Sequence, residues 1–223
     1  MQMYTELLTK SFYSFGEGAS DTHEILARAK DLGYPALALT DTNLCGAHEF
    51  AMSARQYGIK PITGGQFTLE DDSRIVLLAR SRVGYANLSR LFTNANAYDR
   101  KTPKISSDEL ANRAEGLTII TGCNDSLLSN LVVDNHTLEA ENLLKHYLLS
   151  FGNDAVFIGL HQNRVYGDTA RNRKLTELGR RMSIPLVATN NVVYHSPARH
   201  RLQNVLTAIR LNSTLDEAIH KIK

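Results

Sequence analysis

The feature that most constrains the fold of this chain is a repeated alternation of short apolar runs with longer amphipathic stretches. Seven runs have the length and composition of strands, at residues 4–8, 36–40, 60–69, 74–79, 117–121, 155–160 and 186–189. Helical patterns follow most of them, near residues 21–31, 46–57, 84–97, 138–151, 169–182 and 198–210. Repeated β-α units of this length predict an α/β fold with a mainly parallel sheet covered by helices. A closed barrel and an open doubly wound sheet fit this rhythm equally well.

Local signals sharpen the element boundaries. Ser20 and Asp21 predict a helix N-cap, and Gly33 predicts the end of that helix. Residues 71–73 (Asp-Asp-Ser) predict a hairpin turn between two extended segments. Residues 101–107 are expected to form a polar loop. Neither a linker nor a low-complexity tract interrupts the pattern before about residue 195, which predicts one continuous domain over most of the chain.

Composition narrows the function classes. The chain has 223 residues, 43% hydrophobic and 22% charged, which is typical of a globular protein. No apolar run approaches the ~20 residues of a membrane span, and the N-terminus lacks a signal-peptide pattern, so we expect a cytoplasmic protein without membrane contact. The net charge of +2 does not predict direct DNA binding. Cys45 and Cys123 lack CxxC spacing, and both are expected to be small buried residues.

Polar side chains follow the predicted strands. They occur at residues 9–11, 41–43, 64–66, 122–124, 161–163 and 190–191. Strand ends of α/β folds converge on one face, so these residues predict a polar pocket there. Of the eight histidines, only His161 and His195 follow strands and are expected near it. Phosphate-binding glycine motifs and a GxSxG nucleophile turn do not occur in the sequence.

Several segments, in order along the chain, resemble one known family. They are ELLTKSFYSFGEGAS at residues 6–20, LGYPALALTDTNLCG at 32–46, GIKPITGG at 58–65, RSRVGYANLSRL at 80–91, EGLTIITGC at 115–123, VATNNVVYHSPAR at 187–199, LQNVLTAIR at 202–210 and TLDEA at 214–218. Together they resemble the N-terminal polymerase-and-histidinol-phosphatase (PHP) domain of bacterial C-family DNA polymerase III α subunits. The last segments are most similar to the error-prone subgroup.

The resemblance implies a distorted seven-stranded (β/α)7 TIM-like barrel. It also implies a PHP domain over residues 1–196, followed by a helical exit segment over 197–223 that leads toward the polymerase palm. Intact family members bind up to three Zn²⁺, Mn²⁺ or Mg²⁺ ions at the C-terminal strand ends and hydrolyse phosphoesters. Such chemistry needs charged or imidazole ligands that converge on cations and activate water.

This chain departs from the family pattern at nearly every ligand. The positions that the resemblance implies as ligands carry other residues, namely Leu8, Lys10, Thr42, Gln66, Asn163, Asn191 and Val193. An amide oxygen brings no charge to offset a divalent cation, and the Lys10 ammonium repels one. We therefore expect no intact metal site, no cofactor and no catalytic residues. A residual pocket could retain Lys10, Asp41, Cys123, His161, Arg164 and His195.

Three hypotheses follow. The first is a non-catalytic module that stabilises a replicative or error-prone DNA polymerase and presents a docking surface. Its partners would be the rest of the α subunit, a proofreading exonuclease and, through the parent polymerase, DNA. The second is a residual metal-dependent phosphoesterase, 3′-5′ exonuclease or pyrophosphatase. The third is a pocket in which Lys10 and Arg164 hold an anion. The polymerase's own catalytic carboxylates lie in the palm of the resembled family, so we expect no polymerisation from this segment.

Overall fold

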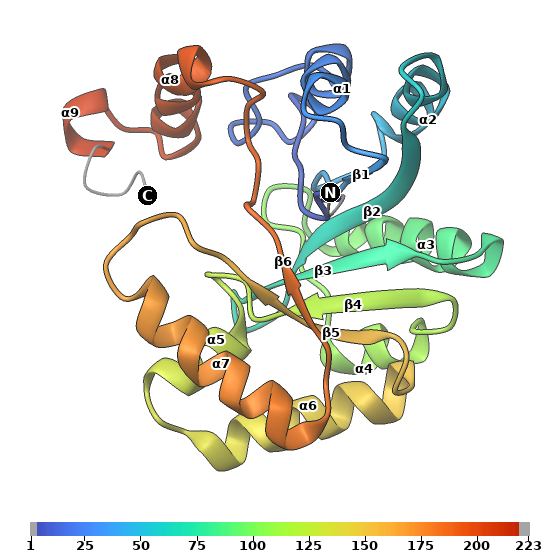
Figure 1. Cartoon of the computed structure of the whole chain (residues 1–223), viewed down its shortest axis with the longest axis vertical. Coiled ribbons are helices and arrows are strands. Elements are labelled where there is room, and N and C mark those ends of the chain that lie inside the picture. Colours follow the sequence, from blue (N-terminus) through green and yellow to red (C-terminus); the bar gives the residue numbers. More distant parts are fainter. Residues whose placement is uncertain (1–3, 219–223) are drawn as a thin grey trace. The chain divides into compact units, whose positions relative to one another are not determined.

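The computed structural model describes residues 4–218, except for the side chain of residue 98 (Figure 1). The chain forms two compact units. The first unit contains the residues up to Thr63 together with those from Asn191 onward, and the second unit contains Gly64–Asn190. The predicted division at residue 196 stays a prediction, although residues 197–218 are indeed mostly helical.

Six strands pair in sequence order. They are β1 (Ala36–Leu39), β2 (Lys60–Thr68), β3 (Arg74–Ala79), β4 (Leu117–Thr121), β5 (Val156–Leu160) and β6 (Leu186–Ala188). The pairings β1–β2, β4–β5 and β5–β6 are parallel, whereas β3 is antiparallel to both of its neighbours. The reversal follows from the predicted turn at residues 71–73, where the side chain of Asp71 accepts a 3.0 Å hydrogen bond from Ser73 N. The α/β class is confirmed, with a mixed sheet.

The first predicted strand, residues 4–8, does not form a regular ladder. Its neighbourhood makes only single parallel bridges, Glu6 with Leu37 and Thr9 with Val192. The reason is local, because the buried Glu6 carboxylate accepts hydrogen bonds of 3.0 Å from both Leu7 N and Leu8 N. These backbone donors are thereby withdrawn from strand pairing.

The helices of the described residues are α1 (Thr22–Asp31), α2 (Ala47–Gln56), α3 (Arg82–Tyr98), α4 (Ser107–Asn112), α5 (Leu127–Val133), α6 (Thr137–Phe151), α7 (Asp168–Met182), the 3₁₀ turn η1 (Pro197–Arg199), α8 (His200–Arg210) and α9 (Leu215–Ala218). Six of them, α1, α2, α3, α6, α7 and α8, match the predicted positions within a few residues. The sequence reading missed α4 and α5. Both are short, and each begins at a serine whose hydroxyl caps the first turn, Ser106 and Ser126. No helix in the described part of the chain has the length and apolar composition of a membrane span.

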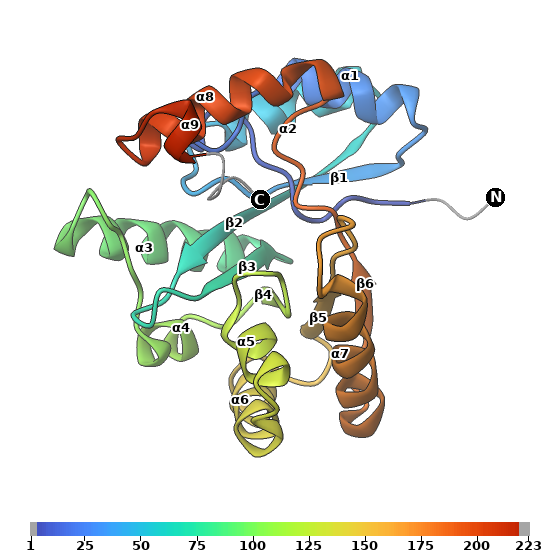
Figure 2. The same ribbon diagram turned by 90° about the vertical axis from the view of Figure 1, so that its left-hand side faces the viewer.

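The first unit has its own apolar core. Asp21 caps α1 through a reciprocal capping box with Glu24. The apolar face of α1 packs with β1 and α2 in one cluster of Ile25, Leu26, Ala29, Leu37, Leu39, Phe50, Ala54 and Ile59. Figures 1 and 2 show α1 and α2 next to each other above β1. The C-terminal end of β1 is therefore held firmly, and the residues that follow it start from a fixed position.

The second unit places helices against its strands. Helices α5, α6 and α7 gather along β4, β5 and β6 in both views (Figures 1 and 2). The side chains of β3, β4 and β5 are mostly buried, including Val76, Ile119, Val156 and Ile158, whereas those of β6 are half-buried or exposed. A strand that is buried on both faces has a continuous apolar sequence. The positions of these strands could therefore be predicted well from the sequence.

Two cysteine predictions had different outcomes. Cys123, directly after β4, is buried as expected. Cys45 is exposed, so its prediction was wrong. Its backbone N–H is bonded to the Asn43 side chain in a surface turn before α2, where a small residue serves the turn rather than the core. From their place in the sequence patterns, histidines 48, 136, 146, 200 and 220 are expected on helices; 48, 146 and 200 lie on helices, His136 precedes α6, and residue 220 lies outside the described residues.

The close approach of α3 to the start of β4 gives a stability prediction. A Cβ added to Gly84 would lie 1.9 Å from the backbone oxygen of Gly116. We expect Gly84→Ala to lower the free energy of unfolding by about 1–3 kcal/mol, because the backbone must shift. Gly179→Ala in α7 is the matched control, since its nearest obstacle is a movable Leu186 methyl at 2.8 Å. Urea unfolding that ranks the two variants in the opposite order would contradict this packing.

Candidate functional site

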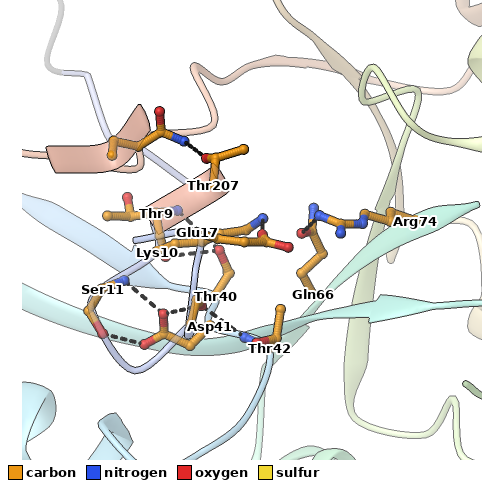
Figure 3. A network of polar contacts seen from close by, with 12 residues as sticks. Thr9, Lys10, Ser11, Glu17, Thr40, Asp41, Thr42, Gln66, Arg74 and Thr207 are labelled. Carbon is orange, nitrogen blue, oxygen red and sulfur yellow. Dashed lines mark hydrogen bonds and ion pairs between the residues drawn. The ribbon is translucent and has the colours of Figure 1, made fainter. Parts of the chain in front are cut away.

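A lysine is buried at one of the positions that the sequence analysis predicts as a former metal ligand. Lys10 is only 2% exposed, and its Nζ forms an ion pair with Glu17, whose side chain is 13% exposed (Figure 3). The backbone N–H of Lys10 donates to Val192 O at 2.8 Å, which fixes where the side chain starts. The Glu17 carboxylate therefore neutralises a cation that is part of the protein itself.

Asp41, the acid that follows β1, is fully engaged by the loop of residues 11–18. Its Oδ1 accepts hydrogen bonds from Ser11 N at 2.7 Å and Ser14 Oγ at 2.6 Å, and its Oδ2 accepts one from Ser11 Oγ at 2.6 Å. Burial raises the pKa of the Asp41 carboxyl, while these hydrogen bonds and the positive charge of Lys10 oppose the rise. The carboxylate thus organises this loop, which we call the Asp41 loop.

Other family ligand positions of the first unit are also occupied by structural contacts. Leu8 is 1% exposed and belongs to the apolar core. Thr42 donates its backbone N–H to Ser14 Oγ at 3.2 Å. Asn191 has a left-handed backbone with φ 51°, and Val193 O accepts a hydrogen bond from Ala19 N at 2.8 Å. None of these side chains carries a charge that could bind a cation.

His195 connects the segment after β6 to the beginning of α1. Its Nδ1 lies 2.8 Å from Ser20 Oγ, and its backbone N–H donates to the same oxygen at 3.0 Å. Glu24 Oε2 lies 3.7 Å from Nδ1, and Glu24 also forms an ion pair with Arg199. In a catalytic triad the serine and the acid contact opposite ring nitrogens of the histidine. Here both Ser20 and Glu24 approach Nδ1, so these residues do not form a triad.

In the second unit, the amide at residue 66 binds a protein cation. Gln66 is 6% exposed, and its Oε1 accepts a 3.3 Å hydrogen bond from Arg74 of the neighbouring strand (Figure 3). The family glutamate at this position would bring a negative charge, whereas the amide brings a dipole. The positively charged guanidinium of Arg74 binds the amide oxygen, which is the atom of Gln66 that could otherwise bind a metal cation.

His161 is the most chemically distinctive residue of the second unit. It is 1% exposed at the end of β5, and neither ring nitrogen has a hydrogen-bond partner among the described residues. Burial, aided by the charge of Arg171, lowers the pKa of His161 to about 4, so the ring is neutral at pH 7. Unpartnered polar atoms also occur at the ends of β4 and β6, on Thr121, Asn124 and Thr189. Cys123 is buried at the same end of β4.

Asn163 and Arg164 lie on an exposed loop after β5. Asp168 holds this loop, because its Oδ2 accepts from Asn163 N at 2.8 Å and from Val165 N at 3.2 Å. These hydrogen bonds and the nearby Arg171 lower the pKa of the buried Asp168 despite its desolvation. Arg164 is exposed with φ 61°. Neither residue is placed as a ligand.

The structure brings together some predicted residues and adds others. In the first unit the Asp41 loop joins Lys10 with Asp41, and in the second unit Cys123 and His161 follow adjacent parallel strands. The sequence patterns placed Ser11 among the polar residues of the pocket, but they did not single out Glu17, Ser14 or Asp168, although the first two lie within the motif of residues 6–20. Across residues 4–218, no group of three or more His, Cys, Asp or Glu side chains is placed to hold a metal ion.

Comparison with known proteins supports the resemblance. A protein-family model described as "PHP domain" matches residues 6–163. The error-prone DNA polymerase of Symbiobacterium thermophilum is 33% identical over 232 residues, covering 96% of this chain and 21% of the polymerase. That of Dechloromonas aromatica is 36% identical over 217 residues, covering 96% of this chain and 20% of the polymerase. The chain therefore spans about a fifth of the length of these relatives.

Solved structures show the same fold at low sequence identity. A two-domain protein from Bacteroides vulgatus, containing a predicted PHP-like metal-dependent phosphoesterase, has a TM-score of 0.60 at 11% identity, covering 91% of this chain and 55% of that chain. The lesion-specific endonuclease PfuEndoQ from Pyrococcus furiosus has a TM-score of 0.59 at 15% identity, covering 87% and 49%. These likenesses confirm the predicted PHP fold.

The buried His161 generates a pH prediction. Its pKa is lower in the folded chain than the ~6.5 of an unfolded chain, so folding disfavours its protonation. Its contribution to stability is full above pH ~6.5 and is lost as the pH falls toward 4, with a slope of at most ~1.4 kcal/mol per pH unit. Urea unfolding at pH 7 and pH 5 should show a smaller pH dependence for His161→Leu than for the unsubstituted chain. The exposed His146→Leu is the control, and an unchanged pH dependence in His161→Leu would contradict the assignment.

Proposed function

The chain belongs to the PHP domain family, and from this premise we propose that it is a non-catalytic PHP domain of a bacterial DNA polymerase III α subunit. Its role would be to stabilise the polymerase and to present a docking surface during DNA replication. The observation that carries the proposal is the buried ion pair of Lys10 and Glu17 at a family metal-ligand position. A lysine ammonium in this place supplies positive charge permanently, without a bound metal.

Physical reasoning supports a structural role for the pair. The family site would collect negative ligands around cations, and removing the cations alone would leave repelling charges. Here the negative ligands are largely absent, and the remaining acids have protein partners: Lys10 for Glu17, and the two serines of the loop for Asp41. The loop is thereby closed by internal contacts, so its conformation does not require an added ion.

The identity of the parent rests on the relatives. The error-prone DNA polymerases match almost the whole chain at 30–36% identity, and each is several times longer than the match. We propose that the parent is such a polymerase, a nucleotidyltransferase of the cytoplasm. Residues 1–196 would form its PHP domain and residues 197–223 its exit segment toward the palm. The rest of the α subunit, a proofreading exonuclease and, through the parent, DNA would be the partners.

A residual metal-dependent phosphoesterase or exonuclease is the second candidate. It is favoured by one observation: His161 presents two unpartnered ring nitrogens in the neutral form that binds metals. Against it, Asp41 already accepts three hydrogen bonds, and His195 is bonded to Ser20. The proposed anion pocket is not favoured, because the charge of Lys10 is neutralised by Glu17.

The ion pair can be tested by a double-mutant cycle. Lys10→Met removes the ammonium that pairs with Glu17, and Glu17→Gln removes the carboxylate that pairs with Lys10. Each single change should lower the free energy of unfolding by about 3–5 kcal/mol, because an uncompensated buried charge remains. The double variant Lys10→Met/Glu17→Gln should lose clearly less than the sum of the two, as measured by urea unfolding. The exposed pair Arg80 and Asp154 provides a matched control cycle with a small coupling. Additive losses in the Lys10–Glu17 cycle would contradict a structural role.

The absence of catalysis can be tested on purified protein. We expect metal analysis to find no tightly bound multi-metal cluster, and we expect no cleavage of labelled single-stranded DNA with Mn²⁺ or Zn²⁺, because charged ligands are missing. Two or more tightly bound ions per chain would overturn the proposal. If cleavage occurs and is abolished by Asp41→Asn and His161→Gln, but not by the surface control Asp108→Asn, the second candidate is correct.

A further inference from the structure

Helix α8 exposes three of its four large apolar side chains, and it buries a threonine and an alanine. Leu202, Val205 and Ile209 are 40%, 39% and 68% exposed. Their spacing of three and four residues places them on one stripe of the helix. Thr207 and Ala208, on other faces, are the buried residues of α8. An isolated globular unit would place the apolar stripe inside, so the orientation is the reverse of the usual one.

Contacts on the inward side of α8 hold the helix in this orientation. Gln203 Nε2 donates to Thr207 Oγ1 at 2.9 Å, so these two inward polar groups satisfy each other within the helix. The buried Asn204 Oδ1 has no hydrogen-bond partner among the described residues. Arg210, at the end of α8, packs its aliphatic stem on Gly16 of the Asp41 loop, where an added Cβ would lie 2.8 Å from the Arg210 Cβ. The helix is therefore held in place by a close contact of the first unit. The same unit also exposes Leu215 of α9, which packs beside α8 (Figure 2).

We propose that this stripe of Leu202, Val205 and Ile209 is an intramolecular docking surface for the part of the polymerase that follows this segment. The inference rests on the proposed function, in which the chain is one section of a longer polymerase. The occupant would present an apolar face of its own. Its rim would carry carboxylates facing Arg201 and Arg210, the exposed cations that lie beside the stripe.

The size of the stripe favours a covalently linked occupant over a free partner. A helix of 11 residues is about 16 Å long, so one stripe offers on the order of 200 Å². A stable interface between separate proteins buries roughly 800 Å² on each side. A section of the same chain needs less area, because tethering gives it an effective concentration near the millimolar range. The relatives, about five times longer than the match, supply such a section.

The test measures side-chain burial in the full-length polymerase chain. Ile209→Cys and, separately, Arg201→Cys would be labelled with a polar maleimide, and the rate would be read by mass spectrometry on the α8 peptide. Each rate is divided by the rate of the same variant unfolded in urea, which removes differences in intrinsic thiol reactivity. We expect Ile209→Cys to react at least roughly tenfold more slowly than Arg201→Cys, which corresponds to about 1.4 kcal/mol of protection. Leu202→Cys should show the same protection.

Two results would overturn the inference. Equal normalised rates for Ile209→Cys, Leu202→Cys and Arg201→Cys would show that nothing covers the stripe. Protection that disappears on dilution would assign the stripe to a second copy. The readout does not depend on metal content or nuclease activity, so failure here leaves the proposed non-catalytic role intact. A native reading frame that ends near residue 223 would instead contradict the proposed polymerase parentage.

Discussion

The buried ammonium of Lys10 is the constraint on which the rest of the first unit depends. A cation that is 2% exposed must have a counter-charge, and Glu17 provides it from the far end of the Asp41 loop. The loop therefore has to fold back on the N-terminal segment. Asp41, fixed by the core behind β1, holds the middle of the same loop through Ser11 and Ser14. The carboxylates of Glu17 and Asp41 thus hold the Asp41 loop in one conformation.

The consequences reach beyond the pair. The closed loop carries Gly16, on which the Arg210 stem packs, so the position of α8 is coupled to the loop. On the C-terminal side of the loop, the Ser20 hydroxyl binds His195, which belongs to the segment after β6. The contacts of the Asp41 loop in this unit therefore also connect the N-terminal segment to the C-terminal helices.

The polar residues of the second unit are not all satisfied by protein partners in the way that Lys10 and Asp41 are. Gln66 accepts a hydrogen bond from Arg74, whereas His161 at the end of β5 is neutral at pH 7 and has no hydrogen-bond partner among the described residues. A buried imidazole without a partner is costly, and a long aliphatic side chain would avoid that cost. This imidazole, which follows the strand adjacent to the one that leads to buried Cys123, is the feature of this structure that most favours the residual-metal alternative.

The sequence by itself determined the positions of six of the seven predicted strands and of most helices, because these depend on local periodicity. It missed α4 and α5, which are too short for a periodic signal, and it could not foresee that Glu6 would withdraw Leu7 and Leu8 from a strand. Only the tertiary structure decided which carboxylate neutralises Lys10, because the partner is set by the path of a loop. It also decided that the apolar stripe of α8 faces outward. The 3.6-residue period reveals such a stripe, but the contacts of Arg210 and Thr207 choose the face that is buried.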